Sequence, residues 1–296
     1  MAKKLEITNP AGITQIFELY YRRGEEEALT DFKGFTDSFG VSVTYERSPF
    51  QQGATAVALR AETRALSFVM HILRPTQEEL ESRVASIVEF MNPYLGELTI
   101  IHDNGVRRRR IQAYYIGHTL VSYEDNKGYG ALAIELMADN AFFEDENIQV
   151  VEIGSDTGAF LFPIEFPFQF GADLVDVTIE NTGDYHNPVE MVLAGPLESP
   201  ELVRDVYEGS TIVQSDTLNF ENLTVLEGWS IRLNTEQGRE EATLIDPDGV
   251  EENLNRYLSA DSNYWQLFVG TNVIRFTSSA GNPYTQIRFR RKFIVA

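Results

Sequence analysis

The sequence has no cysteine and only four histidines in 296 residues. Without cysteine the chain has no disulfides, no thiolate zinc sites and no thiol catalysis. Four scattered histidines leave little room for a histidine-rich metal site. We therefore expect no metal and no cofactor. Stability must come from a packed core, for which a hydrophobic content of 43% is sufficient.

Long apolar runs and positive charge are also scarce. No stretch approaches the ~18 consecutive apolar residues of a membrane-spanning helix. The chain has 24 basic residues against 45 acidic ones, a net charge of −21. That balance argues against a protein that grips nucleic-acid phosphates. It suits a soluble chain, or a surface that meets basic partners.

Only one segment, Thr76–Asn92, has the residue pattern of a long helix. Its apolar residues recur at helical spacing and form one stripe, made of Leu80, Val84, Ile87, Val88 and Met91. Thr76 and Glu79 form a capping box at its start. Pro75 and Pro93 close its two ends. Because no second helix of similar quality exists, we expect this helix to pack on a sheet.

Most of the remaining sequence is typical of strands and turns. Val41–Tyr45 alternates apolar and polar residues, and Asn104-Gly105 between two extended runs predicts a hairpin. Short strands every 8–12 residues predict a β-sandwich in the second half. We expect a mainly β fold with one helix and two domains, residues 1–150 and 151–296. The Pro-interrupted Phe160–Gly171 is expected to be an extended linker or an edge segment.

The densest basic run follows the predicted hairpin turn. In a strand, Arg107 and Arg109 face one way and Arg108 and Arg110 the other. One interpretation is a solvated hairpin arm. The other is a contact with acidic residues of an adjacent subunit or protein, which makes these four arginines candidate interface residues. A nucleic-acid patch is the weakest interpretation, given the overall charge.

Catalytic signatures are lacking. The sequence has no G-x-S-x-G, H-E-x-x-H or P-loop pattern, and nothing selects a glycosidase pair among 45 acidic residues. Asp246-x-Asp248-Gly249 resembles a calcium loop only superficially, because the glycine comes too early. Trp229 and Trp265 could stack on a sugar, but their alternating strands favour core packing. We therefore expect no catalytic residues and no enzyme.

Several turn signatures in the second half resemble, in order and spacing, those of siphophage tail proteins. They are residues 179–189 with Gly195-Pro196, residues 226–238 with Asp248-Gly249, residues 267–276 and residues 287–293. The first half, with one helix before a proline and an Asp-x-x-Phe-Phe exit, is consistent with this pattern. Over nearly its whole length the chain is similar to the distal tail protein (Dit) family, the baseplate hub of siphoviruses.

The resemblance implies an N-terminal module similar to tail-tube folds, a β-sandwich or barrel plus the helix, which closes a ring expected to be hexameric. It implies a galectin-like C-terminal β-sandwich. The expected function is a structural hub in the virion, at the tail tip or baseplate, made in the host cytoplasm. The hub would join the tail tube to the adsorption apparatus and leave a channel through which DNA passes without specific binding.

Expected partners are further copies of the chain, the tail tube protein, a tail-associated hub or lysin protein, and receptor-binding or baseplate proteins. No catalytic or galectin sugar-binding residues carry over. The alternatives are a carbohydrate-binding or receptor-binding accessory protein of the virion tail, and a cell-wall hydrolase.

One expectation is physical. Six copies of a chain with a charge of −21 repel one another, so their interfaces must offset that repulsion. We expect Arg107 to Arg110 to face acidic residues of a neighbour. An acidic channel would also keep passing DNA from adhering.

Overall fold

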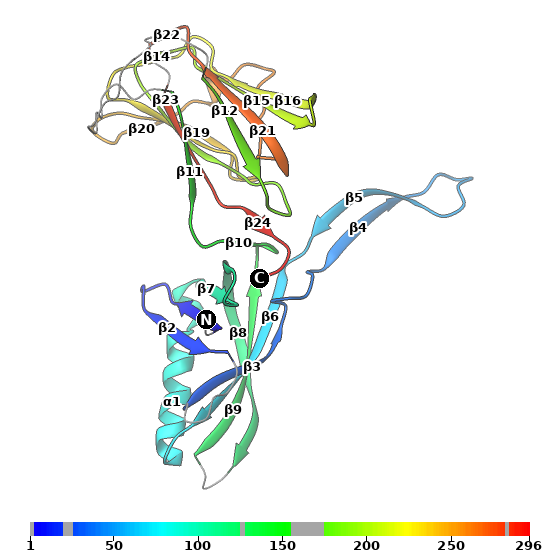
Figure 1. Ribbon diagram of the computed structural model, residues 1–296, viewed down its shortest axis with the longest axis vertical. Coiled ribbons are helices and arrows are strands. Elements are labelled where there is room, and N and C mark those ends of the chain that lie inside the picture. Colours follow the sequence, from blue (N-terminus) through cyan, green and yellow to red (C-terminus); the bar gives the residue numbers. More distant parts are fainter. Residues whose placement is uncertain (1–2, 20–25, 125–127, 155–174, 282–283) are drawn as a thin grey trace. The chain divides into compact units, whose positions relative to one another are not determined.

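The computed structural model describes residues 3–19, 26–124, 128–154, 175–281 and 284–296 (Figure 1). The predicted linker at residues 160–171 lies outside these ranges. The chain divides into a first unit, Met1–Glu146 with Phe293–Ala296, and a second unit, Asn147–Lys292. The division falls after Glu146, whereas the sequence predicted a boundary between residues 150 and 151, and the last four residues return to the first unit. The mainly β architecture with one long helix is confirmed.

The first unit is built on one strongly curved antiparallel sheet with the strand order β2-β1-β7-β8-β9-β6-β3. A parallel bridge between Leu19 and Leu29 links its two edges, so the sheet curls back on itself. Its strands are β1 (Lys4–Thr8), β2 (Thr14–Glu18), β3 (Glu27–Lys33), β6 (Arg64–Leu73), β7 (Leu98–Asp103), β8 (Arg108–Glu124) and β9 (Tyr129–Ala138).

Strand β8 belongs to both halves of this sheet. Its first part, to Ala113, pairs with β7, and its second part, from Tyr114, pairs with β9. The short strand β10 (Phe143–Asp145) pairs with β8 and with β24 (Lys292–Phe293). One continuous strand therefore joins the two halves of the sheet around the core.

The core of the first unit follows the period of two that strands impose on side chains. Alternate residues of β6 and β9 are buried: Leu66, Phe68, Met70 and Ile72 on β6, and Leu132, Ile134 and Leu136 on β9. Each such side chain stabilises the fold by about 1.5–3 kcal/mol when it leaves water. This alternation keeps the sheet in register.

Helix α1 spans Gln77–Phe90 and confirms the predicted helix. The Oγ1 atom of Thr76 accepts a hydrogen bond from the backbone N–H of Glu79 (3.3 Å), which is the Thr76 half of the predicted capping box. The short 3₁₀ helix η1 (Pro93–Leu95) follows it directly. Local sequence signals therefore set both ends of α1.

The predicted apolar stripe is only partly a core stripe. Leu80, Ile87 and Met91 are buried in the core, and Val84 packs against it. Val88 lies outside this cluster and lines a groove on the helix surface. The prediction that Val88 packs in the core was wrong. The apolar stripe is wider than the part of the helix surface that the sheet covers.

Ion pairs fix α1 against the edge of the sheet. Arg83 of α1 binds Glu27 of β3 through two hydrogen bonds of 2.6 and 2.9 Å, and it also donates to Gln15 of β2 (3.1 Å). Arg74 pairs with Glu27 as well. Burial raises the pKa of Glu27, but the two guanidinium groups outweigh burial and hold that pKa below its ordinary value of 4.5.

The second unit is an antiparallel sandwich, as the strand spacing predicted. One sheet has the order β11-β23-β13-β18-β19-β20 and the other β12-β21-β15-β16, with a small third sheet β17-β14-β22. The larger sheet comprises β11 (Gln149–Ile153), β13 (Glu190–Ala194), β18 (Ser230–Asn234), β19 (Glu241–Ile245), β20 (Glu251–Asn253) and β23 (Tyr284–Phe289). The others comprise β12 (Val175–Asn181), β15 (Glu201–Glu208), β16 (Thr211–Asn219) and β21 (Gly270–Thr277), then β14 (Leu197–Glu198), β17 (Thr224–Val225) and β22 (Ala280–Gly281); the 3₁₀ helix η2 spans Asn255–Tyr257.

Buried side chains from both sheets fill the sandwich. The first sheet contributes Met191, Leu193 and Leu233, and the second contributes Leu202 and Phe276. Among the residues that the structure describes, no helix is long and apolar enough to cross a membrane.

The predicted hairpin at Asn104-Gly105 forms, but not with the expected turn. Gly105 has a positive φ of 84°, whereas Asn104 is not among the non-glycine residues with positive φ. Instead, the Oδ1 atom of Asn104 accepts hydrogen bonds from the backbone N–H groups of Val106 (3.0 Å) and Arg107 (2.9 Å). The asparagine closes the loop through its side chain as well as through its backbone N–H, which donates to the carbonyl oxygen of Arg107 (3.2 Å).

Candidate interface site

A protruding hairpin of the first unit is exposed along both of its strands. Among the described strands, β4 (Val41–Glu46) and β5 (Thr55–Ala61) pair only with one another, and residues 41–61 are called the arm. The arm extends away from the other strands of the unit (Figure 1). Its exposed apolar side chains are Val41, Tyr45, Phe50, Val57 and Leu59.

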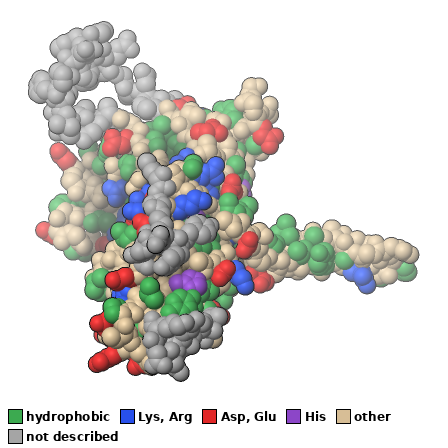
Figure 2. Space-filling view, turned by 60° about the horizontal axis from the view of Figure 1, so that its bottom comes forward, with side chains coloured by type: hydrophobic (Ala, Val, Ile, Leu, Met, Phe, Trp, Pro, Cys, Tyr) green, Lys and Arg blue, Asp and Glu red, His purple; other side chains and the backbone are tan. Residues whose placement is uncertain are grey.

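The exposed fractions of these apolar side chains are large. Leu59 is 72% exposed and Phe50 is 100% exposed. Figure 2 shows hydrophobic and uncharged side chains over most of the arm. A two-stranded hairpin is marginally stable alone in water, and grouped exposed apolar side chains mark interaction sites. The arm is therefore the strongest candidate for a surface that another molecule covers.

The tip of the arm is shaped by its own hydrogen bonds. The Nε atom of Arg47 donates to the carbonyl oxygen of Gly53 (2.8 Å), and the side-chain amide of Gln51 donates to Oγ1 of Thr55 (2.8 Å). Gly53 has a φ of 90°, which favours glycine. The loop thus presents Phe50 to solvent in a defined conformation.

A buried arginine holds the base of the arm. Arg64 is 1% exposed, and its guanidinium group donates to the carbonyl oxygens of Gly34 (2.7 Å), Ala141 (2.5 Å), Ile294 (2.7 Å) and Asp37. Gly34 and Asp37 precede β4, and Arg64 itself begins β6 just after β5. One side chain therefore fixes both ends of the arm to the body of the unit.

The surroundings of Arg64 are aromatic. Its guanidinium carbon lies 4.7 Å from the ring centre of Phe143 and 5.6 Å from that of Phe39. Burial lowers the pKa of Arg64 to about 10, an effect that the nearby charge of Asp37 opposes. The group therefore stays charged at neutral pH, and backbone carbonyl dipoles balance that charge.

Three of the four candidate interface arginines make contacts within their own unit. Arg108 pairs with Glu6 (3.0 Å) and Glu146 (2.8 Å), and Arg110 lies 3.8 Å from Glu144.

Arg109 is buried: its guanidinium group lies 3.5 Å from the ring centre of Phe293 and donates to the carbonyl oxygen of Val295. Arg107 has an exposed side chain. The proposed contact with a neighbour remains a prediction, and Arg107 is the residue best placed to make it.

The second unit also has a buried charge cluster. Arg204 is fully buried, pairs with Asp216 and donates to the carbonyl oxygen of Gln266. Its guanidinium carbon lies 4.5 Å from the ring centre of Phe268 and 5.9 Å from that of Trp265. Ion pairing and aromatic faces thus compensate the desolvation of this charge.

The sequence carried a signal for both buried arginines that our sequence analysis missed. Arg64 alternates with Leu66 and Phe68, and Arg204 alternates with Leu202 and Val206. An arginine at the inward position of an apolar alternation predicts a buried, hydrogen-bonded guanidinium. Neither arginine was among the candidates.

The remaining candidates have structural roles. Asp246 accepts hydrogen bonds from the backbone N–H groups of Asp248 (2.9 Å) and Val250 (2.8 Å), so its carboxylate closes a turn. Trp265 is buried in the core of the second unit, and Trp229 packs against that core. Within the described ranges, no group of three or more His, Asp or Glu residues could hold a metal ion.

Two histidines have a perturbed pKa. Burial lowers the pKa of His102, with a further lowering from Lys3 and an opposing effect of Asp103. Burial also lowers the pKa of His186, and the positive charge of Arg204 adds to this shift. Both imidazoles are therefore neutral in the folded protein at neutral pH.

Comparison with known proteins gives a match at the level of three-dimensional structure. No protein-family model and no curated protein sequence matches the chain. The Dit (gp 19.1) protein of SPP1 superposes with a TM-score of 0.62 and 12% identity, covering 98% of this chain and 99% of that protein. The chain has the Dit fold. The SPP1 Dit structure is described as a paradigm of the hub adsorption apparatus in phages that infect Gram-positive bacteria.

Two structures of the phage P2 baseplate in its activated conformation agree with the Dit fold. The calcium-bound baseplate gives a TM-score of 0.54 at 10% identity, and the strontium-bound one 0.52 at 9%, with complete coverage of both chains. The match to the Dit fold therefore includes both units.

Removing the charge at the base of the arm tests its anchoring role. Arg64→Met leaves the carbonyls of Gly34, Asp37, Ala141 and Ile294 without their donor. We expect the free energy of unfolding to fall by about 3 kcal/mol or more, as when one partner of a buried charged network is removed. The matched control is Arg60→Met, at an exposed position on the arm, which should change stability by less than about 0.5 kcal/mol. Urea unfolding measures both; equal effects would contradict the anchoring role.

The depressed pKa of His102 predicts acid sensitivity. Below its ordinary pKa of 6.5 the unfolded chain binds a proton that the folded unit resists, so stability falls as the pH drops from about 7 to about 5. His186 contributes with the same sign. His102→Phe keeps a ring beside Phe35 and should make the curve of unfolding free energy against pH flatter. An unchanged slope in this variant would rule out His102 as a contributor.

Proposed function

We propose that this protein is a structural hub at the tip of a phage tail, within the tail tip or baseplate of the virion. The observation that supports it most is the Dit fold over 98% or more of the chain, which includes both units. Similarity over a single sandwich would favour many functions. Similarity over two different units, joined in the same order as in Dit, favours a function like that of the whole Dit protein.

The protein acts by contact rather than by chemistry, and we propose no enzymatic activity for it. Its arm carries apolar side chains that the described residues of the first unit leave exposed. We propose that copies of the chain assemble through this arm into a ring, hexameric as in the sequence-based expectation. An arm on one copy and a different surface on the next form a head-to-tail contact, which closes into a ring when the rotation permits.

The ring joins the tail tube to the adsorption apparatus and leaves a channel for DNA. The proposed neighbours are the tail tube protein, a tail-associated hub or lysin protein, and receptor-binding or baseplate proteins. The net charge of −21 supports a channel through which DNA passes without being bound. The same charge requires that contacts between copies offset their repulsion.

Negative-stain electron microscopy of the full chain tests the ring. We expect particles with a central hole, and their rotational symmetry gives the number of copies. In a variant with residues 45–57 replaced by Asn-Gly, the remaining strands form a short hairpin. This variant should keep the thermal stability of the parent and lose the rings. Solitary particles of the parent protein, or rings that persist without the arm, would each contradict the proposed assembly.

Arg107 tests the electrostatic part of the proposal. Arg107→Glu should weaken assembly at low salt, because it places a negative charge where a neighbour's acidic residue is expected, and salt should reduce the difference. Arg109→Glu is the contrasting variant: it places a carboxylate against Phe293 in the interior and should unfold the first unit. Sedimentation at two salt concentrations measures assembly. Unchanged assembly of Arg107→Glu would refute the contact.

A further inference from the structure

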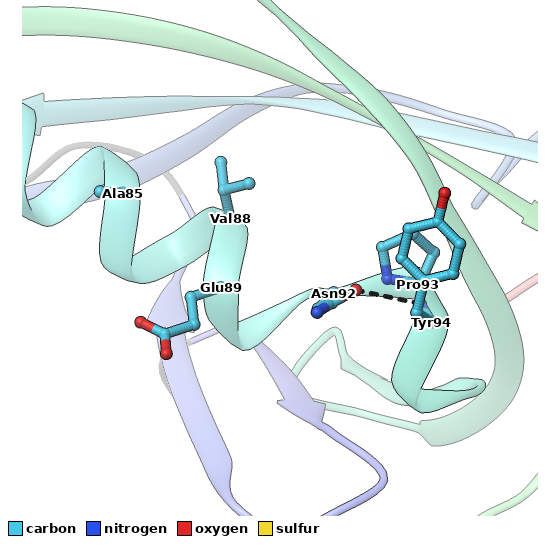
Figure 3. A pocket seen from close by; sticks show the side chains of 6 residues that line it. All are labelled: Ala85, Val88, Glu89, Asn92, Pro93 and Tyr94. Carbon is cyan, nitrogen blue, oxygen red and sulfur yellow. Dashed lines mark hydrogen bonds between the residues drawn. The ribbon is translucent and has the colours of Figure 1, made fainter.

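A groove on the first unit complements the tip of the arm. The groove is about 580 Å³ in volume and lies where α1 meets η1. It is lined by Ala85, Val88, Glu89, Asn92, Pro93 and Tyr94 and is called the helix groove. In Figure 3, Ala85 and Val88 lie on the helix side, and Pro93 and Tyr94 lie on the η1 side.

The helix groove is apolar although it faces solvent. Tyr94 is 96% exposed, and the next residue, Leu95, is 55% exposed. Val88 belongs to the apolar stripe of α1 but lies outside the core. The Oδ1 atom of Asn92 accepts the backbone N–H of Tyr94 (3.0 Å), which fixes η1 relative to the end of α1. The groove is thus pre-formed, as a binding surface with low ordering cost requires.

We propose that the helix groove receives Phe50 from the arm of a second copy of this chain. The proposal rests on the proposed ring and names its contact. Phe50 is a fully exposed aromatic residue at the tip of the arm. Buried aromatic anchors in pockets supply most of the binding energy of protein interfaces. Both surfaces are apolar, belong to the same chain and differ from each other, so their contact is head-to-tail.

The charges of the two surfaces are complementary. The arm has two arginines and one glutamate (Arg47, Arg60 and Glu46), a net charge of +1 in a chain of −21. Helix α1 has four glutamates and one arginine, a net charge of −3. All four glutamates are exposed, while Arg83 is bound to Glu27. The arm is therefore attracted to the acidic helix of a neighbour.

One ion pair follows from this arrangement. Arg47 lies three residues before Phe50, and Glu89 lines the helix groove. When Phe50 enters the groove, Arg47 reaches Glu89 of the second copy. The pair favours the orientation of the arm in which Arg47, rather than its acidic neighbour Glu46, faces Glu89.

Cysteine cross-linking tests the contact, and the cysteine-free chain gives a clean background. Gln52→Cys marks the tip and Ala85→Cys marks the groove, so Phe50, Val88 and Glu89 stay intact. The two single variants are co-expressed with different tags, and the purified assembly is treated with a short thiol-reactive cross-linker. We expect a product that carries both tags. Gln77→Cys, exposed at the start of α1 and about 12 Å along the helix axis from Ala85, replaces Ala85→Cys in the control and should give at least tenfold less product.

The other outcomes overturn the contact. Equal yields with Gln77→Cys and Ala85→Cys mean that the tip is not seated in the groove. Product from Gln52→Cys alone, without the mixed product, means that arms meet each other. Rings seen by electron microscopy without any cross-link refute the contact but leave the proposed function standing. Absence of rings in the parent protein refutes the proposed function itself.

Charge reversal provides a second, independent measurement. Arg47→Glu and Glu89→Arg should each raise the concentration needed for half-maximal assembly by at least threefold. The double variant should assemble at a lower concentration than Arg47→Glu alone, because the pair is restored with opposite signs although the hydrogen bond from Arg47 to Gly53 is not. Circular dichroism and thermal unfolding check that each variant is folded. Folded single variants that assemble normally, or a double variant worse than both, would overturn the pairing.

Discussion

One buried positive charge holds the first unit together where its chain segments meet. Within the described part of the chain Arg64 has no buried carboxylate as its partner; four backbone carbonyls surround it instead. A guanidinium suits this task because its donors form a rigid planar fork that reaches several acceptors at once. The four acceptors lie before β4, after β9 and in the last residues, so segments far apart in sequence are joined through one side chain. The protruding arm depends on this base.

Most of the local structure could be predicted from the sequence, because its causes are local. The spacing of Leu80, Ile87 and Met91 and the cap at Thr76 predicted α1, and alternation predicted the strands. Val88 shows the limit of such patterns. An apolar stripe on a helix indicates which side chains favour burial, but it does not indicate which surface buries them.

The candidate site was less predictable because its causes are distant. Arg64 is buried by residues as far away as Ile294, 230 positions along the chain. The run Arg107 to Arg110 was the visible charge signal, yet most of it serves contacts inside the unit. Val41–Tyr45 has the alternation of a strand with one covered face, although both faces of the arm are open within the first unit. That openness shows only in the folded chain.

The return of the last residues to the first unit has a consequence for synthesis. Phe293 and Ala296 belong to the first core, and Val295 accepts a hydrogen bond from Arg109. The second unit is therefore an insertion in the first, made of one unbroken stretch. The synthesis of the second unit starts after that of the first. All residues of the second unit nevertheless leave the ribosome before the last four residues of the first unit do. The first unit can complete its core only after Phe293–Ala296 have been made. The order in which the units fold therefore need not follow the order of translation.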